Sequence, residues 1–263
     1  MRIGSTLFAW CFALQVLLLA SPGLAQTGHA RLDELLVQGA DRYARGDLKG
    51  AQASYLDALV VAPGRFTVLH RLARVESMLA EGASGEDARG IVAAAVEHAR
   101  EAVKVAPDSA AGHLELAVAL GRQALKEGPK TQLSLSREIK SEVDRTLALD
   151  SKLGRAWHVL ALWNRELASL NLFERTVART ILGGVPRGAT MENAVADLRK
   201  AVELEPAYVN HRLELGRTYL QLKRRDEARR ELERAVALPS TGSPLDPRYQ
   251  AEARELLTRL KQG

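Results

Sequence analysis

The chain is almost free of cysteine. Its single cysteine, Cys11, lies in an apolar stretch near the N-terminus that we expect to be removed with a signal peptide. A mature protein without cysteine has neither a disulfide bond nor a thiol nucleophile. Exported proteins are usually free to form disulfides. This one therefore has to hold its core together by apolar packing.

Catalytic and metal-binding patterns are missing as well. No two of the six histidines are three or four residues apart, the spacing that places two metal ligands on one helical turn. No glycine-rich phosphate loop follows a strand, and no serine, histidine and acid form a recognisable catalytic motif. The sequence therefore predicts no metal, no cofactor and no enzymatic activity. The histidines are His29, His70, His98, His113, His158 and His211.

The one long apolar run lies within the first 25 residues. Arg2 precedes an apolar stretch from Leu7 to Ala20, and small residues follow it up to Ala25. This order is typical of a secretory signal peptide, so we expect residues 1–25 to be cleaved and the protein to be periplasmic or secreted. An uncleaved anchor is the alternative, but the run of about 14 residues is shorter than the roughly 20 needed to span a bilayer.

A strong excess of one charge is also missing. The chain has 37 basic and 32 acidic residues, a formal net charge of +5 and a pI near 9.5. Arg2 is the only charged residue of the predicted leader, so its removal lowers the net charge to +4. Basic and acidic residues interleave along the chain instead of forming blocks. We therefore expect no nucleic-acid partner.

What the sequence does contain is a 34-residue repeat, clearest between Tyr208 and Ser240. Its spacing fits two amphipathic helices joined by the polar turn 223–226. Small residues recur where the two helices cross closely, and large ones fill the gaps between them. This is the pattern of the tetratricopeptide repeat, whose hairpins bury their apolar faces against one another. The small residues are Gly216, Ala228 and Ala235, and the large ones are Leu215, Tyr219 and Leu232.

Four similar units precede this one. Together they predict an all-α fold, a right-handed tetratricopeptide-repeat solenoid of helical hairpins with a C-terminal capping helix. The closing positions Ser151 and Pro206 are 55 residues apart, so the fourth repeat carries an insert between its two helices. We expect its first helix to run from Arg155 past Ala168. The predicted domain, 26–263, divides into repeats at about 31–63, 66–107, 110–151, 154–206 and 207–240, with the cap at 246–261.

The third to fifth repeats carry a more specific set of residues. They include the runs Ala110–His113 and Leu120–Arg122, the pair Trp157 and Trp163, the insert Phe173–Arg175 before Gly183 and Gly184, and the closing run Leu215–Leu220. With these residues, the region from about 105 to 260 resembles the regulator of microtubule dynamics family. The resemblance implies an all-helical array without catalytic residues. Eukaryotic members are linked to microtubules or organelle membranes, but the leader looks bacterial, so tubulin binding is not carried over.

The first helices of such a solenoid line a concave groove in which peptides bind. Here the groove positions combine arginine, histidine and amide side chains, which can hold a peptide carboxylate or a lipid phosphate. We interpret the protein as a non-enzymatic scaffold or adaptor of the cell envelope that binds a protein or peptide partner. The alternative is a solvated face whose arginines serve only solubility. The groove positions are Arg155, His158, Leu162 and Arg165 in the fourth repeat and Asn210, Leu213, Arg217 and Gln221 in the fifth.

The insert 170–182 supports a second hypothesis. Its apolar residues recur at helical spacing, with Arg175 and Arg179 beside them. Such a helix can pack on its own array and close one end of the groove, which is the arrangement we favour. Alternatively, the insert contacts a lipid or membrane surface through Phe173 and the two arginines.

Overall fold

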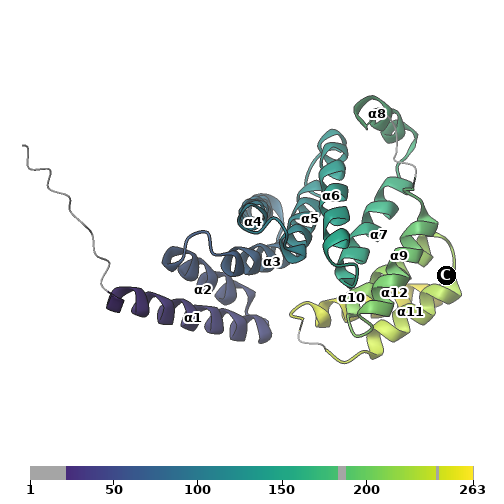
Figure 1. The fold of residues 1–263 in the computed structure, drawn as a ribbon. Helices are drawn as coiled ribbons and strands as arrows, with labels where there is room; N and C mark the ends of the chain where they lie inside the picture. The colour runs from purple at the N-terminus through teal and green to yellow at the C-terminus, as the bar shows by residue number, and fades with distance from the viewer. Residues whose placement is uncertain (1–21, 183–187, 241–242, 263) are drawn as a thin grey trace, which may run out of the picture.

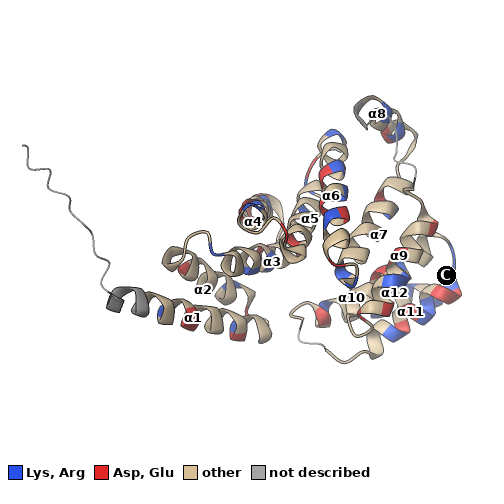
Figure 2. Cartoon of the chain, viewed as in Figure 1, with Lys and Arg blue, Asp and Glu red and all other residues tan. Residues whose placement is uncertain are grey.

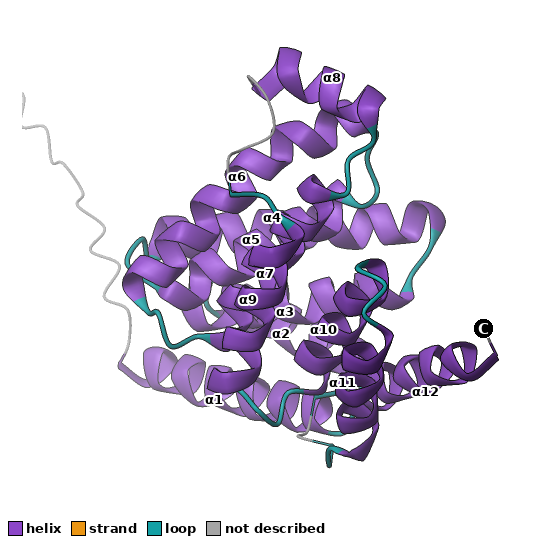
Figure 3. Cartoon of the chain, turned by 90° about the vertical axis from the view of Figure 1, so that its right-hand side faces the viewer, coloured by secondary structure: helices purple, strands orange, loops and turns teal. Residues whose placement is uncertain are grey.

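The computed structural model describes residues 22–182, 188–240 and 243–262, which form helices joined by short loops (Figures 1 and 3). Twelve helices occur in these residues, and none of the residues forms a strand. The helices are α1 (Pro22–Ala44), α2 (Leu48–Val61), α3 (Phe66–Gly82), α4 (Gly85–Val105), α5 (Ala110–Ala124), α6 (Pro129–Leu149), α7 (Gly154–Ala168), α8 (Leu172–Leu182), α9 (Met191–Leu204), α10 (Val209–Gln221), α11 (Arg225–Ala237) and α12 (Asp246–Gln262).

Ten of these helices pair into five hairpins. The pairs are α1 with α2, α3 with α4, α5 with α6, α7 with α9, and α10 with α11, while α12 packs on the last pair. Each hairpin also contacts the next one, so the array advances from α1 to α12 as the chain does (Figure 1). The predicted all-α solenoid of helical hairpins is thus confirmed.

Small buried residues mark the places where paired helices cross. Ala228 and Ala235 of α11 are fully buried against α10, as the repeat pattern predicts. On the facing side, a β-carbon added at Gly216 would lie only 2.7 Å from Leu232 Cγ. Interiors are packed so tightly that a single methyl group at such a crossing matters. The small residues therefore set how closely the two backbones approach.

The N-terminal helix begins at Pro22, so the last four residues of the predicted leader belong to α1. The rest of the predicted signal peptide, 1–21, lies outside the described residues. Among the helices that are described, none combines the length and apolar character that crossing a bilayer requires.

Charged residues of both signs are mixed over the helices (Figure 2). Many form exposed pairs one helical turn apart, such as Lys140 with Asp144 at 2.7 Å and Arg234 with Glu231 at 2.8 Å. Pairs of this kind contribute about 0.3–0.5 kcal/mol each. The interleaved charges thus add little to the stability that apolar packing provides.

The fourth hairpin differs from the others because α8 lies between its two helices. α7 ends at Ala168, so the expectation that it runs further is wrong. The break has a local cause: the Glu174 N–H donates to Asn171 Oδ1 at 3.0 Å, and the Asn171 N–H donates to Glu174 Oε2 at 2.8 Å. This reciprocal capping box starts a new helix. α8 then packs on α6, where Ala178 is fully buried.

The crossing of α10 and α11 predicts opposite effects for two Gly→Ala substitutions. Gly216→Ala places a methyl group against Leu232, and we expect the free energy of unfolding to fall by about 1–3 kcal/mol. Gly90 lies in α4 with open space around it, so Gly90→Ala should raise the free energy by about 1 kcal/mol through helix propensity. Urea unfolding followed by circular dichroism measures both. Equal stabilisation by the two changes would show that Gly216 is not at a close crossing.

Candidate functional site

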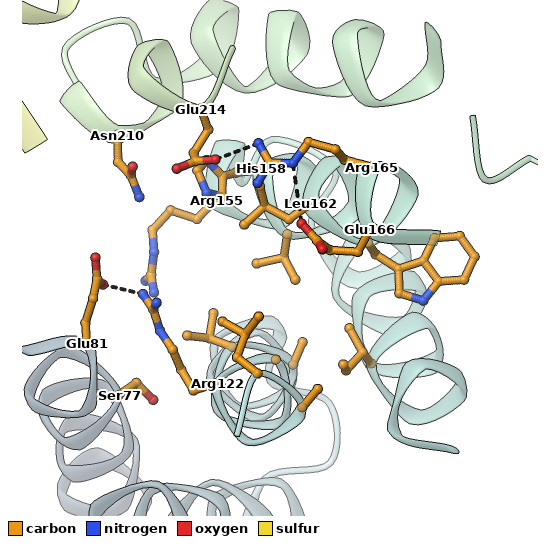
Figure 4. A pocket seen from close by; sticks show the side chains of 18 of the residues that line it. Ser77, Glu81, Arg122, Arg155, His158, Leu162, Arg165, Glu166, Asn210 and Glu214 are labelled. Atoms are coloured by element: carbon orange, nitrogen blue, oxygen red, sulfur yellow. Dashed lines mark hydrogen bonds and ion pairs between the residues drawn. The ribbon is translucent and has the colours of Figure 1, made fainter. Parts of the chain in front are cut away.

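A cavity of about 570 Å³ lies between the hairpins of the array (Figure 4). Its walls come from α1, α3, α5, α6, α7, α8 and α10, which together belong to all five hairpins, and residues just before and within α12 complete them. Ligand sites usually measure about 300–1,000 Å³. The cavity therefore has the size of a binding site and joins all five hairpins.

One end of the cavity is apolar. Leu133 and Ile139 of α6 and Leu162 and Trp163 of α7 line it. The indole of Trp163 donates its N–H to the Ser136 carbonyl at 2.8 Å, so its polar edge is satisfied and its ring supplies apolar surface. This end can receive an apolar group without leaving a polar atom unpaired.

The other end is charged but balanced. Among the described residues that line the cavity, five are arginines and five are glutamates. Arg155 donates to both carboxylate oxygens of buried Glu115, at 2.9 and 3.3 Å, and Arg165 donates to Glu214 at 2.7 Å. Arg217 donates to the same Glu214 at 2.6 Å. The three arginines that the sequence places in the groove are therefore paired. Arg74 of α3, which also lines the cavity, makes no ion pair within the described residues and lies over the Tyr43 ring, 5.5 Å from its centroid.

The Arg155–Glu115 pair shows how strongly these charges depend on one another. Burial alone would lower the pKa of Arg155, but the adjacent Glu115 carboxylate raises it well above its ordinary value. Burial would likewise raise the pKa of Glu115, and Arg155 outweighs this effect so that the pKa is lowered. Both groups stay ionised, and neither can be removed without leaving a buried charge behind.

Two side chains of the wall carry a buried polar oxygen that has no hydrogen-bond partner among the described residues. Neither Ser77 of α3 nor Asn210 of α10 makes a hydrogen bond within the described part of the chain, and Ser77 Oγ and Asn210 Oδ1 are both buried. Figure 4 shows the Asn210 side chain pointing into the opening. Buried polar groups are usually paired, so an unpaired amide in a cavity wall indicates a place for a ligand.

A contact between the second hairpin and the cap closes one side of the cavity. The Tyr249 hydroxyl donates to Glu81 Oε2 at 3.1 Å, and Arg248 donates to the Glu81 carbonyl at 2.9 Å. Arg122 of α5 forms an ion pair with the same carboxylate (Figure 4). Burial, and then the Glu81 charge, raise the pKa of Tyr249, so its hydroxyl remains a donor. We call these contacts of Glu81 the clasp.

Two histidines meet where α7 packs near α10. His158 Nδ1 and His211 Nδ1 are 2.9 Å apart, and His211 Nε2 is 3.3 Å from Glu205 Oε2. A carboxylate only accepts, so His211 carries its proton on Nε2 and His158 donates from Nδ1. Burial, then His211 and Arg165, lower the pKa of His158 well below its ordinary value. Burial also lowers the pKa of His211, against the opposing effect of Glu205. Both rings are therefore neutral.

The structure brings six of the predicted groove residues to the cavity, but not all of them. Leu213 is fully buried in the core, so its assignment to the groove is wrong. Glu214, the next residue, takes the groove position because it lies one turn after Asn210. Gln221, the last residue of α10, is exposed and does not line the cavity. The residues that do line it are Arg155, His158, Leu162, Arg165, Asn210 and Arg217.

The insert residues have separate environments. Glu174 and Leu170 line the cavity, so the start of the insert closes one end of it. The Arg175 guanidinium donates at 2.9 Å to the carbonyls of Ala168 and Leu170 and thereby caps α7. Phe173 is 72% exposed, and Arg179 is also exposed. The side chains of residues 177, 181 and 182 lie outside the described part of the chain.

Sequence reasoning missed the residues of the clasp and the carboxylates that pair with the arginines. Tyr249 and Glu81 are 168 positions apart, and Arg165 and Glu214 are 49 apart. No local spacing relates such residues. Within the described residues, no group of three or more histidine, cysteine or acidic side chains is placed to hold a metal ion.

The model of the family described as Regulator of microtubule dynamics protein 1-3 matches residues 30–261. The chain belongs to this family. The match confirms the resemblance of the later repeats and extends it over the first two. The cavity and the clasp are therefore features of a regulator of microtubule dynamics family member.

Individual relatives agree with this assignment. Regulator of microtubule dynamics protein 1 from Bos taurus is 30% identical over 193 residues, which are 72% of this chain and 60% of that protein. Protein 1 from Mus musculus is 27% identical over 234 residues, 88% of this chain and 75% of the relative. Protein 3 from Rattus norvegicus is 30% identical over 228 residues, which are 85% of this chain and 48% of that protein. This chain thus spans about half of the rat protein and less than two thirds of the bovine one.

Solved structures support the repeat fold of this family member. A thermophilic TPR protein of Thermus thermophilus superposes with a TM-score of 0.63 at 21% identity, covering 84% of this chain and 98% of that one. The structure of Pseudomonas aeruginosa pilF has a TM-score of 0.50 at 16% identity, and the superposition covers 90% of this chain and 95% of that one. At these identities the likeness concerns the fold alone.

The neutral histidine pair predicts a stability that falls in acid. The ordinary pKa of histidine is 6.5, and both groups have lower pKa values in the folded protein. Below about pH 6.5 the unfolded chain binds more protons than the folded one, so the free energy of unfolding decreases as pH falls. The free energy of unfolding should be highest above about pH 6.5. Urea unfolding between about pH 8 and pH 5 measures the slope.

The variant His158→Gln provides the comparison for this slope. This variant keeps the other histidines, including His98. A hydrogen bond with Glu76 raises the pKa of His98, so its effect on the slope is opposite to that of the pair. We expect a shallower dependence on pH than in the unchanged protein. Parallel curves for the two proteins would show that the pair does not couple folding to protonation.

Proposed function

We propose that this chain is a non-enzymatic helical-repeat adaptor whose concave cavity holds a short extended segment of a partner protein. The predicted signal peptide supports action in the cell envelope after export, as part of the same proposal. The family and the fold support a scaffold that regulates through binding. The proposal that the cavity holds a partner segment rests on one observation, the unpaired amide of Asn210 in its wall.

An amide side chain suits a peptide backbone. A primary amide offers an acceptor and two donors, which complement the N–H and C=O groups of a peptide unit. Ser77, on the opposite wall, supplies one more donor and acceptor. An extended segment can therefore pair with both walls while it places one apolar side chain against Leu162 and Trp163.

The paired charges shape what such a segment can carry. Arg155 and Arg165 are held by Glu115 and Glu214, so a carboxylate of the ligand would have to compete with carboxylates that are already in place. Disrupting such a buried pair is unfavourable. The wall thus favours a segment that is uncharged where it enters the cavity. The cavity therefore suits an uncharged segment better than the carboxylate or phosphate ligand that the sequence suggests.

Filling the cavity from within should abolish binding without harming the fold. Gly121 of α5 lines the cavity, and a β-carbon there would meet no atom within 4 Å. Gly121→Leu should occupy this space and add about 0.5–1 kcal/mol of helix stability. We expect peptides selected from a random library on the unchanged protein to lose measurable affinity for the variant. Isothermal titration calorimetry measures the loss.

Gly90→Leu is the matched control, because Gly90 is exposed in a helix outside the cavity and also has open space around it. It should bind the selected peptides as well as the unchanged protein does. Asn210→Ala should weaken binding by about tenfold through two lost hydrogen bonds. If peptides bind Gly121→Leu and Gly90→Leu equally well, the cavity is not their site and the proposal fails.

A second function, contact with a membrane surface, is favoured by the tip of α8. Leu172 and Phe173 are 81% and 72% exposed, and they are adjacent at the start of a helix that closes one end of the cavity. Exposed Arg179 of the same helix makes no ion pair within the described residues. An apolar tip beside such a cation is the combination that binds at an anionic lipid interface.

Vesicle flotation tests this second function. The unchanged protein should float with vesicles of anionic phospholipid at low salt, and Leu172→Ser with Phe173→Ser should leave it in the lower fraction. The matched control is Val37→Ser with Val60→Ser, at residues that are 60% and 80% exposed on the first hairpin. Equal flotation of the two double variants would remove the α8 tip as the membrane contact.

A further inference from the structure

A second hollow, of about 410 Å³, lies between α9, α10 and α11. It is on the other side of α10 from the cavity: Arg212, Leu215 and Tyr219 line it, whereas Asn210, Glu214 and Arg217 line the cavity. At 100° per residue these two sets occupy opposite faces of the helix. The hollow is therefore a separate surface that the proposed partner segment does not use.

The hollow contains more cationic than anionic side chains. Four arginines and two glutamates line it, and the arginines come from three helices of two consecutive hairpins. The lining groups that carry charge are Arg199, Arg212, Arg230, Arg234, Glu227 and Glu231. A concave surface with charges of mainly one sign raises the local concentration of the opposite ion.

Both carboxylates already have partners. Glu231 accepts from Arg212 through one oxygen at 2.9 Å and from Arg234 through the other at 2.8 Å. Glu227 accepts from Arg224, which lies next to the hollow, at 2.8 Å from its Nε. That hydrogen bond lowers the pKa of Glu227, so the carboxylate stays ionised and paired. Among the described residues, the two glutamates therefore leave Arg199 and Arg230 without a hydrogen-bonded carboxylate.

Three arginines of the hollow keep N–H donors that have no carboxylate acceptor among the described residues. Arg230 makes no hydrogen bond or ion pair within the described part of the chain. Arg199 uses only its Nε, which donates to the Tyr219 hydroxyl at 3.0 Å. Arg212 Nε is buried and has no acceptor among the residues that the structure describes. A buried donor that lacks an acceptor is rare, and here it lies beside two guanidinium groups with unused N–H donors.

We propose that this hollow binds a phosphate monoester or free phosphate dianion between Arg199, Arg212 and Arg230. Planar guanidinium groups donate pairs of hydrogen bonds to phosphate oxygens, and several of them together match an anion of two charges. The ligand supplies the acceptor that Arg212 Nε lacks. The paired Glu231 holds Arg212 and Arg234 in position around it.

A titration of the purified protein by nuclear magnetic resonance tests the site directly. At about pH 8 both inorganic phosphate and O-phosphoserine are mainly dianions. We expect the Arg212 Nε–H resonance to shift and saturate with either probe. Tighter binding of O-phosphoserine would indicate a phosphorylated ligand, and equal binding would indicate the free ion. An Arg212 resonance that does not move with either probe overturns the proposal.

A pair of double variants separates this site from general attraction to a basic protein. Arg199→Gln with Arg230→Gln should weaken binding about tenfold or more, because each change removes charge-assisted hydrogen bonds. The control, Arg229→Gln with Arg254→Gln, removes the same charge from exposed residues that do not line the hollow. It should leave the affinity nearly unchanged, and circular dichroism should show both variants folded. Equal weakening by the two double variants overturns the proposal.

Discussion

The close crossing of the two helices in each hairpin is the constraint on which the rest of the fold depends. Fully buried alanines lie at these crossings, such as Ala95 and Ala99 in α4 and Ala194 and Ala201 in α9. Without large side chains there, the paired backbones approach closely and larger residues fill the flanks. Repetition of one such geometry turns each hairpin relative to the one before it. The curvature of the array, and with it the concave face, follows from this repetition.

That curvature brings parts of the chain together that are distant in sequence. The C-terminal cap reaches α3, where the Glu81 carboxylate meets Arg122 and Tyr249. A carboxylate removed from water needs such partners, since an unpaired one is strongly unfavourable. The result is a cavity instead of an open groove. The clasp is made by a few side chains, whereas α3 and α12 do not pack along their lengths. It is therefore the part of the enclosure that opens with the least disruption of the core.

Local patterns were sufficient to predict the solenoid, because helix periodicity and small crossing residues are properties of sequence neighbours. The same register placed His158 and Asn210 on the cavity wall. The break after Ala168 was also readable from the capping box of Asn171 and Glu174, although the apolar pattern continues across it. The partners of the groove arginines could not be predicted. Glu115 is 40 residues from Arg155, and only the three-dimensional path of the chain makes them neighbours.

The paired wall explains how a site rich in arginine can suit an uncharged ligand. Each guanidinium that holds a carboxylate is fixed in position, so the wall has a defined shape before a ligand arrives, and less ordering is required on binding. The neutral imidazoles of His158 and His211 fit the same arrangement. A proton on His158 would add a charge beside Arg155 and Arg165, whose carboxylates are already shared or paired. The amide of Asn210 then remains without a hydrogen bond to the described part of the chain. A ligand that satisfies it gains hydrogen bonds without breaking an ion pair.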